Sequence, residues 1–385
     1  MKPVYLDYAA TTPTDHRVVE AMLPCFGDVY GNPSSLHAFG QEAQAAVEGA
    51  RRRIASFMGA DPAEVVFTSG GTESDNWAIK GVAYGNRKRG DHIITSAVEH
   101  HAVLETCRFL EGEGFRVTIL PVDGHGLVDP ANLVRAITDK TILVSIMHAN
   151  NEIGTIQFTA EIGAIARERG VVFHTDAVQT FGHLPFTVDA LNCDLMSASA
   201  HKLYGPKGVG LLYIRKGTRL VPSMHGGEQE GGRRASTLNV PGIVGFGKAV
   251  ELAAASLAAE PARLTAMRDR LVRGLLDSLD GTRLNGHPTR RLPNNVNVSL
   301  GSLEGEGVIL SLDMLGIACS TGSACSSSSM EASHVLTAIG VPKVLAHGSI
   351  RLSLGRCTVE SDIDRVLEVL PQVVGRLRSR SPRSS

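Results

Sequence analysis

The sequence VVFHTDAVQ spans residues 171–179, and DLMSASAHKLYGPKG spans residues 194–208. Each stretch begins as a short apolar run, which is typical of a buried strand, and continues into polar residues that can bind or react. In open α/β sheets, ligands bind beyond the carboxyl ends of the strands. The two stretches therefore predict a sheet with a ligand site along one edge.

The same alternation extends to both sides, from about residue 60 to residue 215. Helical patterns, for example over residues 161–168, separate the apolar runs. Strand–helix alternation is typical of an α/β fold with a mostly parallel sheet that helices cover on both faces. The further strands are predicted at residues 64–67, 92–95, 116–120, 141–146 and 208–214.

A second domain is predicted after an alanine-rich helical stretch over residues 242–259, because Pro261 interrupts the pattern. Its strands are expected near residues 295–300 and 349–353. The last residues, 376–385, read RLRSRSPRSS and are predicted to form a disordered basic tail, since they are polar and charged.

The composition is typical of a soluble enzyme: 43% of the 385 residues are hydrophobic, and the net charge is −1. So small a charge gives no strong attraction to nucleic acid or membranes. No apolar run reaches ~18 residues, and the N-terminus lacks the features of a signal peptide. Six scattered cysteines without a C-x-x-C pair favour reduced thiols in the cytoplasm over disulfides or a zinc site.

Two glycines precede Thr72 in the stretch SGGTESDN, residues 69–76, which leads into a helical pattern. Glycines allow close approach of the backbone, and a helix start offers free amides and a dipole that favour an anion. This arrangement predicts a phosphate site. A plain helix cap remains the alternative, because neither a Walker nor a G-x-G-x-x-G spacing is present.

Lys202 and Asp176 follow two of the predicted strands. A lysine among small residues can be desolvated, which frees its amine as a nucleophile. Lys207 competes for this role, but it lies in a Pro-Lys-Gly turn that we expect to be solvated. Asp176 could hold a protonated heteroaromatic nitrogen, or it could simply cap a helix. With the phosphate site, these residues match the aldehyde, ring nitrogen and phosphate of pyridoxal 5'-phosphate.

Cys325 lies within the run STGSACSSSS, residues 320–329. Glycine and serine runs are typical of mobile loops, and no neighbour in the run is large enough to bury the thiol. We therefore expect a cysteine that moves and reacts. Cys319, which follows the apolar pair Ile317 and Ala318, is expected to be a buried strand residue.

The chain resembles the pyridoxal-phosphate-dependent cysteine desulfurases of the NifS/IscS type, within the class V aminotransferase superfamily. The resemblance runs from residue 5 to about residue 370. The motifs that carry it are YLDYAATTP (5–13), YGNPSS (30–35), EH (99–100), HANNEIG (148–154), SAHK (199–202) and SAC (323–325).

The resemblance implies a homodimer with the aspartate aminotransferase-like fold of pyridoxal-phosphate-dependent transferases, fold type I. In such a fold, residues 15–256 would form the large cofactor-binding domain. Residues 1–14 and 257–375 would form a smaller α+β domain, which would carry the cysteine loop at about residues 320–330.

The resemblance also implies how the cofactor is held. Lys202 would bind its aldehyde covalently. His100 would stack on the pyridine ring and move protons. Asp176 would pair with the ring nitrogen, and Gln179 would reach the ring hydroxyl oxygen.

The phosphate would be held by Thr72, Ser199 and His201, and by Thr237 reaching across from the neighbouring subunit. Relatives usually have Arg and Gly where this chain has Gly231 and Ser236, close to Thr237. The long C-terminal extension of some relatives is replaced here by the Arg/Ser tail.

For the substrate, the resemblance implies that Asn151, which also contacts the cofactor, and Arg351 hold the carboxylate of L-cysteine. Cys325 would accept the sulfur as a persulfide while L-alanine is released. The persulfide would then serve an iron–sulfur scaffold or another sulfur-acceptor protein.

Three other interpretations remain open from the sequence. A selenocysteine lyase would share the reactive cysteine, whereas an aminotransferase acting on small amino acids would not need it. A non-catalytic sulfur-relay or scaffold protein would keep the fold without the chemistry, which the presence of Lys202, Asp176 and His100 disfavours.

Overall fold

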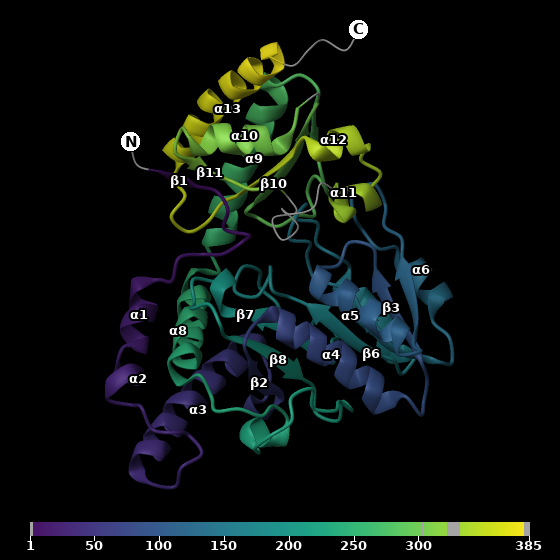
Figure 1. The fold of residues 1–385 in the computed structure, drawn as a ribbon, viewed down its shortest axis with the longest axis vertical. Coiled ribbons are helices and arrows are strands. Elements are labelled where there is room, and N and C mark those ends of the chain that lie inside the picture. The colour runs from purple at the N-terminus through teal and green to yellow at the C-terminus, as the bar shows by residue number, and fades with distance from the viewer. Residues whose placement is uncertain (1–2, 302, 322–331, 381–385) are drawn as a thin grey trace.

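The computed structural model describes residues 3–301, 303–321 and 332–380. Figure 1 shows two domains, a large one built on a seven-stranded sheet and a smaller one that joins the N-terminal strand to the C-terminal third of the chain. The limits expected from the sequence, residues 15–256 for the large domain and 1–14 with 257–375 for the small one, stay a prediction.

The large sheet has the strand order β2-β8-β7-β6-β5-β3-β4. Every neighbouring pair is parallel except those that include β8, which runs antiparallel to β2 and β7. The prediction of a mostly parallel sheet is confirmed, and each strand begins and ends within one or two residues of its predicted bounds. The strands are β2 (Val65–Thr68), β3 (His92–Ser96), β4 (Arg116–Leu120), β5 (Thr141–Ser145), β6 (Val172–Asp176), β7 (Leu195–Ser199) and β8 (Gly210–Ile214).

Helices cover both faces of this sheet. Successive strand residues point to opposite faces, so Leu143 of β5 packs into a core with residues of α4 and α5, while Val144 packs into a core with residues of α3 and α8. Both side chains are fully buried, as expected for a two-sided parallel sheet. The main covering helices are α3 (Ala38–Met58), α4 (Gly71–Asn86), α5 (His101–Gly112), α7 (Thr159–Glu168) and α8 (Val240–Ser256).

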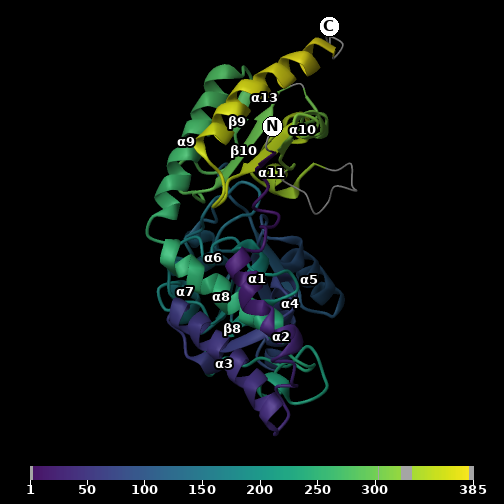
Figure 2. The same ribbon diagram turned by 90° about the vertical axis from the view of Figure 1, so that its left-hand side faces the viewer.

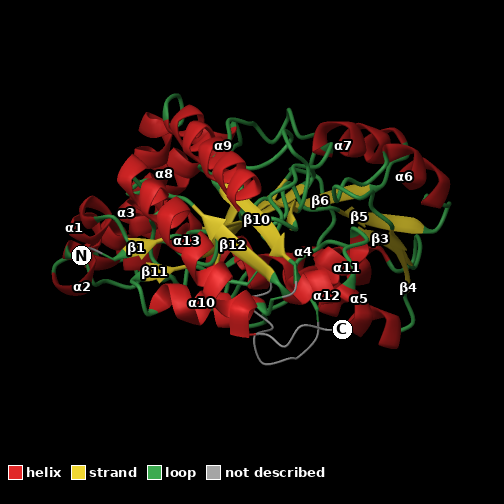
Figure 3. Cartoon of the chain, turned by 90° about the horizontal axis from the view of Figure 1, so that it is seen from above, coloured by secondary structure: helices red, strands yellow, loops and turns green. Residues whose placement is uncertain are grey.

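The small domain contains an antiparallel sheet of order β12-β10-β9 and a separate parallel pair, β1 with β11. Figure 3 shows β10 and β12 beside α9 and α13. The elements are β1 (Val4–Tyr5), β9 (Thr282–Leu284), β10 (Asn295–Leu300), β11 (Ile317–Ala318), β12 (Ser349–Ser353), α9 (Glu260–Ser278), α10 (Gly305–Asp313) and α13 (Glu360–Arg380).

Figure 2 shows α8 of the large domain leading directly into α9 of the small one, with a bend of 74° between them. No single helix in the described ranges is long and apolar enough to cross a membrane, and α8 with α9 meets that test only as a bent pair, by length and composition. The remaining elements are α1 (His16–Met22), α2 (Pro24–Gly27), α6 (Pro130–Ala136), α11 (His334–Ala338), α12 (Lys343–His347), and the 3₁₀ turns η1 (Pro62–Glu64), η2 (Ala200–Lys202) and η3 (Gln229–Gly232).

The expectation of a disordered tail from residue 376 is wrong for residues 376–380, which form the end of α13. Leu377 packs against the small-domain core, four residues after the buried Val373. Arg378 donates hydrogen bonds to the carbonyls of Asp280 and Gly301. These contacts are tertiary, so a polar composition did not reveal them. Residues 381–385 lie outside the described residues.

A chain that ends after Gly375 is expected to melt at a lower temperature than one that ends after Arg380. The shorter chain loses the packing of Leu377 and the hydrogen bonds of Arg378, together worth about 1–2 kcal/mol. Thermal unfolding of the two truncations side by side measures the difference. Equal melting temperatures would show that the last turn of α13 contributes nothing.

Candidate active site

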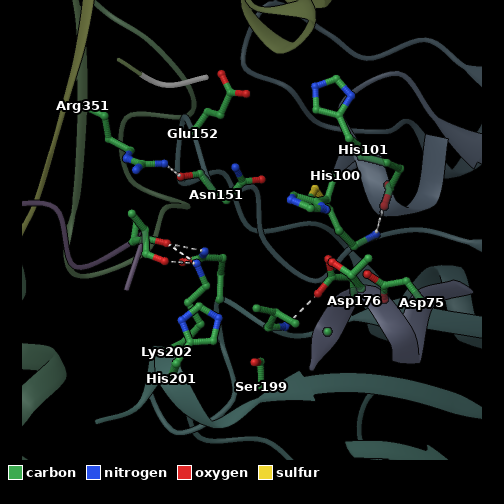
Figure 4. A pocket seen from close by; sticks show the side chains of 18 of the residues that line it. Asp75, His100, His101, Asn151, Glu152, Asp176, Ser199, His201, Lys202 and Arg351 are labelled. Atoms are coloured by element: carbon green, nitrogen blue, oxygen red, sulfur yellow. Dashed lines mark hydrogen bonds between the residues drawn. The ribbon is translucent and has the colours of Figure 1, made fainter. Parts of the chain in front are cut away.

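A cavity of about 410 Å³ lies at the carboxyl ends of β6 and β7, between the two domains. This volume falls within the range that suits a cofactor or small ligand. Figure 4 shows its side chains converging from both domains. It brings together nine of the residues selected from the sequence: Thr72, His100, Asn151, Asp176, Gln179, Ser199, His201, Lys202 and Arg351.

Two of the selected residues are not part of the cavity wall described here. Thr237 is exposed in the loop between η3 and α8. Cys325 lies outside the described residues. The expectation of a buried strand residue is wrong for Cys319, which directly follows β11 and is half-buried. Desolvation still raises the pKa of its thiol to about 12.

Lys202 ends the short turn η2 that follows β7, and its amine contacts the N-terminal segment. Its Nζ donates to the carbonyl oxygens of Ala9 and Ala10 at 2.6 and 2.7 Å. Tyr204, two residues later, has a left-handed φ of +66° and donates its amide to Thr12 Oγ1 at 2.8 Å. A strained residue held in this way is typical of functional sites.

Lys207 is exposed and does not line the cavity. Of the two lysines weighed from the sequence, Lys202 is therefore the one inside the site. Carbonyl oxygens accept but do not donate hydrogen bonds, so Ala9 and Ala10 each accept from an N–H group of the Lys202 amine and fix its position.

Asp176 is the last residue of β6 and is buried. Burial raises the pKa of its carboxyl group to about 6, opposed by the hydrogen bond from the Val178 amide (2.8 Å) and by the charge of Lys202. The bond from Val178 resembles a cap, so that alternative describes part of its role. A buried carboxylate is also suited to an ion-paired hydrogen bond with a protonated ring nitrogen.

The start of α4 lines one part of the cavity and is suited to bind an anion. The first amides of a helix have no acceptor within it, and the helix dipole favours negative charge there. A Cβ on Gly71 would lie 2.7 Å from Val178 Cγ2, so glycine is required for α4 to approach the Asp176 loop this closely. Ser199 and His201 line the same cavity, and burial lowers the pKa of His201 to about 4.

These three features fit pyridoxal phosphate. Its phosphate would be held by Thr72, Ser199 and His201 at the start of α4. Its ring nitrogen would meet Asp176, and its aldehyde would meet Lys202. Gln179 donates its side-chain amide to the Ala9 carbonyl at 3.0 Å, which fixes it beside Lys202.

His100 caps the N-terminus of α5 with its side chain. Its Nδ1 accepts a hydrogen bond from the Ala102 amide at 3.1 Å, so the neutral ring carries its proton on Nε2. Burial lowers the pKa of His100 to about 4, and the charge of Lys202 adds to this shift. At neutral pH His100 is therefore an uncharged ring that can stack and can donate a hydrogen bond from Nε2.

Arg351 reaches the cavity from β12 of the small domain and is 2% exposed. It donates to the Asn151 carbonyl at 2.9 Å and forms an ion pair with Asp7 at 2.8 Å. A planar guanidinium binds carboxylates well, and these contacts orient it in advance.

Three acids in the cavity wall were not selected from the sequence. Asp75 lies four residues after Gly71, on the same side of α4. Glu99 and Glu152 adjoin His100 and Asn151. Helical spacing from Gly71 could have indicated Asp75, but charged neighbours of site residues more often face solvent.

The family model described as aminotransferase class-V matches residues 4–366. The chain belongs to the class-V aminotransferase family. It is 58% identical over 381 residues to cysteine desulfurase IscS of Methanosarcina thermophila, covering 99% of this chain and 94% of that one. It is 56% identical over 381 residues to cysteine desulfurase IscS of Dictyoglomus turgidum, covering 99% and 97%.

Among solved structures, a NifS-like protein superposes with a TM-score of 0.92 at 41% identity, covering 97% of this chain and 100% of that one. The structure of SspA in complex with cysteine superposes with a TM-score of 0.82 at 40% identity, covering 92% of this chain and 100% of that one. The resemblance to the NifS/IscS type is confirmed, and the chain is an enzyme of this pyridoxal-phosphate-dependent family. The role of each residue stays a prediction.

Gly71→Ala is expected to weaken pyridoxal phosphate binding by tenfold or more, because the new methyl group would force Val178 and the Asp176 loop away. Titration of the apoenzyme, followed by visible absorbance, measures this. Gly85→Ala, on the same helix, is the matched control, since a Cβ there meets its nearest atom at an ordinary 3.5 Å. Equal affinity of the two variants would rule out the close approach as a requirement.

Proposed function

We propose that this enzyme converts L-cysteine into L-alanine and leaves the sulfur on Cys325 as a persulfide. The observation that carries the proposal is the convergence of Lys202, Asp176 and His100 in one cavity with the buried Arg351. The similarity to cysteine desulfurases over nearly the whole chain supports the same reaction.

Arg351 and Asn151 would bind the substrate carboxylate. The guanidinium is held by Asp7 and by the Asn151 backbone, so little of its side-chain freedom remains to be lost on binding. The substrate amine would then point toward Lys202, which lines the same cavity as Arg351.

Bound pyridoxal phosphate supplies an electron sink that makes the substrate Cα proton acidic. Lys202 would leave the carbonyls of Ala9 and Ala10 and take this proton. Asp176 would keep the ring nitrogen protonated. General acid–base help of this kind is typically worth ~10²–10⁴-fold.

Sulfur transfer needs no external oxidant. The Cys325 thiolate attacks the substrate sulfur, and the new S–S bond forms as the C–S bond breaks. The electron pair of the broken bond stays on the carbon. Addition of a proton to this carbon then gives alanine. The two sulfurs are oxidised and the carbon is reduced. Because His100 carries its proton on Nε2 and its Nδ1 already accepts from the Ala102 amide, the neutral ring would orient the reacting groups by donating a hydrogen bond. The substrate amine would deprotonate Cys325, and the proton that it takes would complete the carbon.

A homodimer is part of the proposal. Large apolar side chains are exposed around α1 and α2, including Leu23, Phe26, Tyr30 and Leu36 at 60–91% exposure. An exposed apolar cluster of this kind is typical of an interaction site. A second subunit that covered it would also give the exposed Thr237 a partner cavity to reach. In the cytoplasm, the persulfide would pass to an iron–sulfur scaffold or another acceptor protein.

Lys202→Ala is expected to abolish both alanine and sulfide formation from cysteine. Cys325→Ala is expected to lose persulfide formation by at least a hundredfold while keeping the visible absorbance of the cofactor. Cys319→Ala is the matched control, since burial raises the pKa of that thiol to about 12. Undiminished turnover in Cys325→Ala would exclude desulfuration through this thiol and favour a superfamily aminotransferase.

A subunit complementation experiment tests the homodimer. Lys202→Ala and Thr237→Ala subunits, coexpressed with different tags and purified as a mixed dimer, contain one site with both native residues if Thr237 crosses the interface. That dimer should recover about half of the native activity, because one of its two sites is complete. Activity no higher than the Thr237→Ala homodimer would mean that Thr237 serves its own subunit.

A further inference from the structure

Asp75 is a second buried carboxyl group beside Asp176, and its hydrogen bond with the Ser197 side chain leaves one carboxyl oxygen without a donor among the described residues. It lies in the second turn of α4, with its side chain 2% exposed. Figure 4 shows it next to Asp176 in the cavity wall. Its Oδ1 has no hydrogen-bond partner within the described part of the chain. A buried carboxylate oxygen without a donor is costly.

The nearest imidazole does not supply a compensating charge. His174 Nε2 lies 3.6 Å from Asp75 Oδ1, which is too long for a hydrogen bond. Both ring nitrogens already contact hydroxyls, those of Ser145 at 2.8 Å and Ser197 at 3.0 Å. Burial lowers the pKa of His174 to about 3, so the ring is neutral.

The other titratable groups on this side of the cavity affect the pKa values of the two carboxyl groups differently. The charge of Lys202 favours ionised Asp176. Burial, followed by the charge of Asp176, raises the pKa of Asp75 well above its ordinary range; the side-chain hydrogen bond with Ser197 opposes this shift, and the charge of Glu99 adds to it. Burial raises the pKa of Glu99 itself to about 8 and lowers that of His100 to about 4, so both are mainly neutral at pH 7.

We propose that Asp75 is a positioning residue that stays protonated and donates a hydrogen bond to Asp176. Two adjacent buried carboxyl groups cannot readily both ionise, and they share one proton. The proton gives Asp75 a donor, and the bond stabilises the ionised form of Asp176. The inference rests on the role proposed above for Asp176, which is to hold the protonated ring nitrogen of the cofactor.

The test is the affinity of the apoenzyme for pyridoxal phosphate from pH 5.5 to 8.5, followed by visible absorbance. Loss of a donor raises the pKa of Asp176, so its charge is lost at a higher pH. In Asp75→Ala the acid limb of the affinity profile should therefore move up by about one pH unit, a tenfold weaker affinity at the acid end. Asp75→Asn keeps a neutral donor and should stay within about twofold of the native profile.

The asparagine variant shows whether residue 75 acts as a hydrogen-bond donor or through a negative charge, because asparagine can donate but has no charge. If Asp75→Asn moves the limb as far as Asp75→Ala, or if neither moves it, the proposal is wrong. Gly85→Ala controls for changes in α4, and apoenzyme melting temperatures report folding. If Asp75→Ala does not fold, Asp75→Leu takes its place, because leucine also removes the donor but fills the space of the carboxyl group. Asp176→Ala tests the proposed function separately: unchanged binding in that variant would overturn the role of Asp176, whatever Asp75 does.

Discussion

The short N-terminal segment that connects the two domains, residues 6–14, fixes the positions of Lys202 and Arg351 in the cavity. The carbonyls of Ala9 and Ala10 accept from the Lys202 amine, and the Asp7 carboxylate pairs with Arg351. The same segment begins as β1, which pairs with β11 of the small domain. A shift of one domain against the other would therefore move the partners of both Lys202 and Arg351. The arrangement of the domains and the geometry of the site are thus set by the same few hydrogen bonds.

Burial lets the cavity contain many acids and still receive an anionic cofactor. Four ionised carboxylates around a phosphate would repel it and one another. Burial raises the pKa of Glu99 to about 8 and also raises that of Glu152, whose carboxyl accepts from the Ser333 hydroxyl at 2.6 Å. The acids therefore carry less charge at neutral pH than their number in the sequence suggests. The start of α4, at the opposite end from Glu152, remains the electropositive part of the cavity.

The sequence predicts the sheet well because most of its strands are buried on both faces and read as apolar runs, whereas only the edge strand β4 is largely exposed. Asp176 and Lys202 could be selected for the same reason, since a polar residue directly after such a run must lie at the sheet edge. The groups that accept hydrogen bonds from Lys202 could not be predicted from the sequence, because Ala9 is 193 positions away and contributes only a backbone carbonyl. To predict that Asp75 faces the cavity, one must know how α4 is rotated about its axis relative to the sheet. The last turn of α13 depends on the packing of Leu377, which composition does not record.

The loop that leads to Thr237 combines backbone strain with a buried ion pair. Ser236 has a φ of +91°, in the left-handed region that favours glycine, and such a residue costs on the order of 1–3 kcal/mol. Glu230, also left-handed, accepts from the Arg51 guanidinium at 2.6 and 2.8 Å and from the Phe67 amide at 2.9 Å. Truncating one partner of a buried pair like this typically costs about 3–5 kcal/mol, because the remaining charge is left buried and unpaired. The Arg51–Glu230 pair therefore ties the loop that leads to Thr237 to β2, and the strained residue Ser236 lies within a segment that is anchored at its start.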